Sequence, residues 1–509
     1  MVSNGGHFDS WDGVQTFLVA ESMVLKHSAM LYPDVPSIQK LHFDIQQSNN
    51  YHNCCTPDGI LKPAYNMRSL LSAAIAIPFY YAAIIFLASP ITVVALFVNS
   101  MIISLTAVVI FCFSLEIYRS KKIAFVLSLI FSLCSFVWPY NNTFFPQPLE
   151  GLLIIASAFF IYLSAKRDNK RIFFAALAGV FLGASVFAHP TSIIVIPGFI
   201  AYSTLLMRMK IKSISSFLLA LAIILIFVGL VNYWRFGSFT EFGYGGQGSL
   251  SKHQGWTGLI GLLISPGYGL MFFFPILILA PLAFRNLYRE NKGLFFLFSY
   301  IIFANLLFFG TSLHDRELGT ISWTGYGGWG PRYLIPVLPF ITIAFGTLLL
   351  QLRKLQPGNV LLLKVSIIIL CIAGFYVNLA GKLIWYQYGY SYGISEKGLM
   401  KYAGKNSGNV TDSLVETWIP EYSPIVLHTE ALATNFPSKF ELTHDFVNSY
   451  YSYGNAPCSY DIYLLCKFGI IPVLLLSAVI VFLSILIVVQ IYEFNPILWI
   501  KNYNTKRNL

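Results

Sequence analysis

Charged residues are scarce in this sequence. Asp, Glu, Lys and Arg make up only 11% of the 509 residues, while hydrophobic residues make up 56%. Soluble domains carry about 25% charged residues, and a water-soluble fold could not bury this much apolar sequence. The chain is therefore predicted to be an integral membrane protein.

Two other features are lacking. The seven cysteines include no pair spaced as C-x-x-C, so no metal site is expected. Residues 1–68 contain no apolar stretch of the kind that forms a signal peptide. The net charge of +11 does not indicate nucleic-acid binding, because the basic residues lie in short clusters between apolar runs.

The sequence contains many long apolar runs. A helix needs about 20 apolar residues to cross the hydrocarbon core of a bilayer. Residues 69–89 form an ambiguous run with Pro78 in its middle, either a span or a juxtamembrane or re-entrant helix. The predicted spans are about ten within 91–380, namely 91–117, 122–138, 149–165, 172–188, 190–207, 213–232, 268–284, 293–311, 332–351 and 361–380, and a last one at 468–492.

Basic residues alternate between successive connections. One set of six segments holds 18 Lys and Arg, and the intervening four hold three. Cytoplasmic loops carry the excess of Lys and Arg, so the first set and the tail 493–509 are predicted to be cytoplasmic. The loop region 381–467 then lies on the outer face. The basic set comprises 116–122, 166–171, 208–212, 285–292, 352–360 and 493–509.

The side of residues 1–68 depends on the ambiguous run. If 69–89 spans the membrane, residues 1–68 are cytoplasmic. If it does not, they lie outside, and a polar segment of that length is hard to export without a preceding helix. In that case a first transmembrane helix is expected to be missing from the sequence.

Candidate acid–base residues lie near the N-terminus. Asp9 and Asp12 precede a helical-looking stretch, 14–25, where a carboxylate serves either as a general base or as a helix cap. Glu21 lies within that stretch and is either a substrate ligand or a residue facing water. We keep these alternatives open on residue types alone.

Candidate anion-binding residues lie in a predicted outer loop. Arg332 and Tyr333 stand directly before a span, where an arginine either grips a phosphate in two hydrogen bonds or anchors the helix end at the membrane surface. His314 and Arg316 belong to a dense polar cluster in the same loop.

Three stretches together resemble the GT-C superfamily of membrane glycosyltransferases, near its dolichyl-phosphate-mannose protein mannosyltransferase-like members. Residues 330–339 (GPRYLIPVLP) and 258–270 (GLIGLLISPGYGL) are similar to two motifs of that family. Asp12, followed by Gln15 and Glu21, is similar to its acidic first outer loop. Tyr268 departs from the pattern, because relatives often have arginine there.

The resemblance implies an all-α, polytopic GT-C-like helical bundle with outer-face loops and juxtamembrane helices, which favours an outer position for residues 1–68. The implied reaction moves a sugar from a polyprenyl-phosphate donor to an unidentified acceptor on the non-cytoplasmic face, with inversion. Asp12 would be the general base, with Asp9 as its alternative. Metal dependence stays open, and a transporter or flippase of lipid-linked substrates is the alternative function. The implied substrate-binding residues are Arg332, Tyr333, His314, Arg316 and Glu21.

Overall fold

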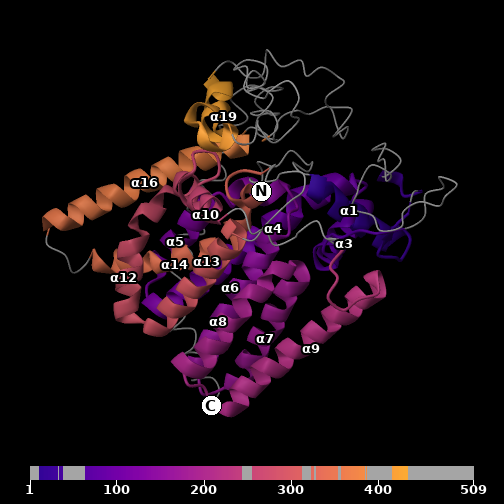
Figure 1. Cartoon of the computed structure of the whole chain (residues 1–509), viewed down its shortest axis with the longest axis horizontal. Helices are drawn as coiled ribbons and strands as arrows, with labels where there is room; N and C mark the ends of the chain where they lie inside the picture. Colours follow the sequence, from indigo (N-terminus) through magenta and orange to yellow (C-terminus); the bar gives the residue numbers. More distant parts are fainter. Residues whose placement is uncertain are drawn as a thin grey trace, which may run out of the picture.

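The computed structural model describes residues 11–32, 34–37, 64–243, 255–311, 322–325, 328–352, 357–383, 386 and 415–433. This part of the chain is almost wholly helical (Figure 1). Its strands are β1 (Met30–Leu31) and β2 (Ala64–Tyr65), which pair antiparallel. The all-α prediction is therefore confirmed for the described residues, whereas the predicted span 468–492 and tail 493–509 lie outside them.

Seven helical segments of the described part are long and apolar enough to cross a membrane. They coincide with seven of the ten spans predicted within 91–380. They are α4 (Pro90–Tyr118), α6 (Gln147–Lys166), α7 (Arg171–Ala188), α9 (Ile211–Phe236), α13 (Lys292–Thr311), the Arg332–Gln351 segment made of η6 (Arg332–Val337), α14 (Leu338–Ala344) and α15 (Gly346–Gln351), and α16 (Pro357–Leu383).

The other three predicted spans are shorter or interrupted. Proline lacks the N–H of a helical hydrogen bond. Pro190 begins η2 and Pro275 begins η4, and in these two runs a 3₁₀ turn precedes an α-helix. Whether the three cross the membrane stays a prediction. They contain α5 (Lys121–Cys134) with η1 (Trp138–Asn142); η2 (Pro190–Val195) with α8 (Ile196–Ala201) and η3 (Tyr202–Leu206); and α11 (Leu270–Phe273) with η4 (Pro275–Leu279) and α12 (Ala280–Glu290).

The ambiguous run 69–89 forms a single helix, α3 (Leu70–Ile85), despite Pro78. Sixteen residues make a helix about 24 Å long, shorter than the ~30 Å hydrocarbon core. It packs against α1 (Trp11–Leu25) and α4. In Figure 1, α1, α3 and α19 (Pro424–Ala433) lie in the upper part, while α7 and α9 run to the bottom. A juxtamembrane position for 69–89 remains a prediction that this length favours.

Two buried apolar clusters hold the helices together. The larger cluster includes residues of α4, α5, α6, α7, α13 and α14. The smaller includes residues of α1, α3 and the first half of α4. By contrast, α9 and α16 bury only 17% of their most apolar windows. These two helices therefore present most of their apolar side chains at the surface of the described part. The remaining helical elements are α10 (Gly255–Ile264), η5 (Ser322–Thr324) and η8 (Pro420–Tyr422).

Candidate active site

Asp12 lies between two arginines that are distant in sequence. Its Oδ1 is 2.5 Å from Nη2 of Arg68, and its Oδ2 is 3.3 Å from Nη1 of Arg332, 320 residues further along the chain. The three side chains are 22%, 13% and 14% exposed, in that order. The carboxylate, in the first turn of α1, therefore joins a partly buried ion-pair network.

Arg68 binds α1 through two side chains. Its Nε donates to Oε1 of Gln15 at 2.7 Å, while its Nη2 binds Asp12. Residues three apart share a helix face, so one planar guanidinium reaches both. Arg235, at the end of α9, donates to the Arg68 carbonyl at 3.2 Å and to that of Asn66, which fixes the backbone before α3. Sequence reasoning missed Arg68, although its place directly before the α3 N-cap was a usable signal.

Arg332 is the first residue of η6, and its guanidinium lies 4.3 Å from the ring centroid of Phe145. A cation over an aromatic face gains electrostatic stabilisation. The neighbouring Tyr333 stacks on Phe309 with ring centroids 4.6 Å apart. Gly330 precedes them with φ +69°, and a Cβ there would lie 2.8 Å from the Phe273 ring. Among the predicted site residues, the structure thus brings Asp12, Arg332 and Tyr333 together.

Glu21 lies apart from this network. It is 3% exposed, so the alternative in which it faces water is wrong. Its Oε1 accepts hydrogen bonds from the Ser37 hydroxyl at 2.8 Å and from the Tyr80 hydroxyl at 3.1 Å. These contacts tie α1 to α3 and to the segment 34–37. Its role as a substrate ligand stays a prediction. Asp9, His314 and Arg316 lie outside the described residues.

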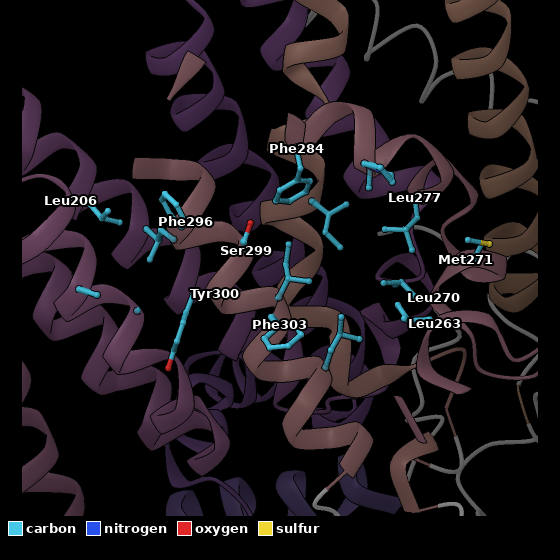
Figure 2. Close-up of a pocket in the computed structure, with 18 of the residues that line it drawn as sticks. Leu206, Leu263, Leu270, Met271, Leu277, Phe284, Phe296, Ser299, Tyr300 and Phe303 are labelled. Carbon is cyan, nitrogen blue, oxygen red and sulfur yellow. The ribbon is translucent and has the colours of Figure 1, made fainter. Parts of the chain in front are cut away.

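An apolar groove of about 840 Å³ lies beside α13 (Figure 2). Its polar lining side chains are Ser299 and Tyr300, and the Tyr300 hydroxyl donates to the Ile194 carbonyl. Leu306, at the far end of the α13 lining, is one turn before Phe309, which stacks on Tyr333. The groove and the stacked Tyr333 ring therefore share α13 as a neighbour. The α13 side chains that line it are Phe296, Leu297, Ser299, Tyr300, Ile302, Phe303 and Leu306.

Within the described ranges, no group of three or more His, Cys, Asp and Glu side chains is arranged to hold a metal ion. The site therefore offers two guanidinium groups, one carboxylate and an apolar approach. This combination can bind an anion attached to a hydrophobic chain and can accept a proton beside it.

No family model and no curated protein matches the chain. Crystal structures of ArnT from Cupriavidus metallidurans, in the apo state and bound to undecaprenyl phosphate, each match with 11% identity and a TM-score of 0.46, covering 81% of this chain and 64% of theirs. The Archaeoglobus fulgidus oligosaccharyltransferase in the apo form matches with 10% identity and a TM-score of 0.43, covering 80% and 57%. The chain thus spans less than two thirds of these proteins. At this identity the likeness carries no information on family or activity.

Proposed function

We propose that the protein is a membrane glycosyltransferase that moves a sugar from a polyprenyl-phosphate donor to an acceptor hydroxyl. The observation that carries this proposal is the carboxylate of Asp12 held between the guanidinium groups of Arg68 and Arg332 at one end of an apolar helical bundle. The same site therefore supplies a proton acceptor and two groups suited to phosphate.

The reaction assigns one task to each group. Asp12 takes the proton of the acceptor hydroxyl, whose oxygen forms a bond to the anomeric carbon of the sugar. The bond from that carbon to the phosphate oxygen breaks, and its electron pair stays on the phosphate. Arg68 and Arg332 bind the departing phosphate, where charge develops in the transition state.

Donor binding also changes the partners of Asp12. In the resting site both carboxylate oxygens are occupied by arginines. A phosphate that binds the guanidinium groups competes with those contacts and frees the carboxylate for the acceptor. The apolar groove beside α13 suits the isoprenoid tail, since its lining is almost wholly hydrocarbon.

Transfer by the full chain in proteoliposomes tests the proposal. Labelled polyprenyl-phosphate hexoses are supplied with membrane extract as acceptor, and transferred label is counted. Asp12→Asn should lower transfer by about 100-fold or more, since a general base contributes 10²–10⁴-fold. Asp168→Asn is the matched control, because Asp168 also pairs with an arginine, Arg171, but is 82% exposed. If the Asp12→Asn protein transfers label as fast as the wild type, Asp12 is not the general base.

The side of the site supplies a second test. The proposed donor is used on the non-cytoplasmic face, so a tag inserted after Leu25, whose side chain is 42% exposed, should be accessible from outside in intact cells. Cytoplasmic accessibility contradicts the outer-face reaction. Label that crosses the vesicle membrane without being transferred supports the transporter alternative instead.

A further inference from the structure

A buried acid and a histidine form a second polar contact between the start of α6 and the end of α7. Glu150, in the first turn of α6, is 1% exposed, and its Oε2 lies 3.1 Å from Nδ1 of His189, directly after α7. Its Oε1 accepts from the hydroxyls of Ser192 at 2.7 Å and Thr191 at 3.4 Å.

Contacts with Glu150 and Thr191 determine how the histidine is held. A buried carboxylate is costly unless its oxygens are paired, and His189 is one of the three side chains that contact Glu150. Nδ1 lies within hydrogen-bond distance of both Glu150 and the Thr191 hydroxyl, so these contacts fix the ring and leave Nε2 as its other nitrogen. Among the described residues Nε2 has no hydrogen-bond partner, and it is not one of the fully enclosed polar atoms. Nε2 is therefore the His189 ring nitrogen left to bind a ligand.

Packing connects this pair to both arginines of the candidate site. Ser69, next to Arg68, donates its hydroxyl hydrogen to the Phe187 carbonyl at 3.2 Å, two residues before His189. On the other side, a Cβ on Gly151 would lie 3.3 Å from the Cα of Pro336, four residues after Arg332. In a 3₁₀ helix four residues rise about 8 Å. The Glu150–His189 pair thus lies beside the elements that carry both arginines.

We propose that His189 is a third anion-binding residue of this site, which donates from Nε2 to a phosphate oxygen of the lipid-linked donor, with Glu150 as its positioning residue. The identity of the anion rests on the proposed function. The chemistry that is recognised is a phosphate group, whether it belongs to a lipid or is free.

The test measures binding of undecaprenyl phosphate to the full chain in nanodiscs, with inorganic phosphate as competitor. His189→Asn places an amide near the Nδ1 position, where it can still donate to Glu150, but removes Nε2. It should bind the lipid phosphate about 10-fold to 100-fold more weakly, the range for one charge-assisted hydrogen bond. Ser192→Ala is the control, because it removes a hydroxyl from Glu150 and leaves Nε2 in place, and it should bind within about threefold of the wild type.

Unchanged affinity of a folded His189→Asn protein overturns the inference. If that variant does not fold, a second experiment uses the wild-type protein. His189 is modified by carbethoxylation, and the modified fraction is measured by mass spectrometry. Undecaprenyl phosphate should slow this modification, and no protection overturns the inference. Protection by inorganic phosphate alone would assign the site to free phosphate and overturn the lipid donor as its ligand. A wild-type protein that binds no undecaprenyl phosphate counts against the proposed function itself, whereas binding that depends on Arg332 but not on His189 counts against this inference alone.

Discussion

Replacing Arg68 tests the site at the residue that sequence reasoning did not find. Arg68→Ala removes the guanidinium from Asp12 and from Gln15 together. The proposed mechanism then keeps one phosphate-binding arginine and loses the group that orients the base. We expect transfer to fall while the helical bundle remains intact, because the larger apolar cluster lies elsewhere.

The size of the loss follows from burial. The side chains of Arg68 and Asp12 are 13% and 22% exposed, so their 2.5 Å contact is stronger than a surface ion pair worth about 0–1 kcal/mol. A hydrogen bond to a charged group contributes about 1.5–3 kcal/mol. This corresponds to a decrease in kcat/KM of about 10-fold to 150-fold. The kcat/KM of Arg68→Lys should lie between those of the wild type and Arg68→Ala, because one ammonium group cannot reproduce the planar fork of the guanidinium.

Transfer kinetics with a labelled polyprenyl-phosphate hexose measure this loss. Arg167→Ala is the control, since Arg167 also contacts a carboxylate, that of Glu116 at 3.0 Å, but is 52% exposed. Its kcat/KM should match the wild type. If Arg68→Ala retains kcat/KM within threefold of the wild type, the arginine pair does not hold the developing charge and the reasoning is refuted.

Three further predictions concern stability, measured as thermal unfolding of the full chain in detergent. Glu21→Gln should destabilise the protein by about 1–3 kcal/mol, because an amide NH2 would replace the Oε2 that accepts from the backbone N–H of Ser37; an unchanged midpoint would contradict this. Gly179→Ala should lower the midpoint, since a Cβ there would lie 2.3 Å from the Phe217 carbonyl oxygen and force α7 from α9; a raised midpoint would contradict it. Burial lowers the pKa of His428 from 6.5 to about 4. The folded state therefore binds fewer protons, and up to about 3 kcal/mol of stability should be lost as the pH falls from about 6.5 to 4, a loss that His428→Gln should abolish.

The spans were predictable because each depends on a local run of apolar residues. Six of them are single α-helices in the structure, and the seventh, Arg332–Gln351, is divided into η6, α14 and α15 and contains prolines that the sequence displayed. The burial of Glu21 was predictable too, since it lies four residues after Phe17 and three before Val24, both buried on α1. Neighbouring apolar residues at helical spacing were a better guide than the charge of the side chain.

The pairing of Asp12 with Arg332 was not predictable in the same way. Each residue was singled out by its local setting, but their contact joins segments 320 residues apart, and no local pattern reports such a distance. Arg68 was missed for the same reason, because its importance comes from the carboxylate that it meets. Local sequence therefore predicts which groups are chemically able to act, whereas packing of the helices decides which of them act together.

Charge balance explains why a base held by two arginines suits the proposed reaction. The resting site has two guanidinium charges against one carboxylate. A phosphodiester donor adds one negative charge and makes the site neutral. When the acceptor proton moves to Asp12, the carboxylate loses its charge as the departing phosphate gains one, so the site stays neutral throughout the chemical step. In a partly buried setting, where an unbalanced charge is costly, this exchange avoids the penalty that a single arginine would leave.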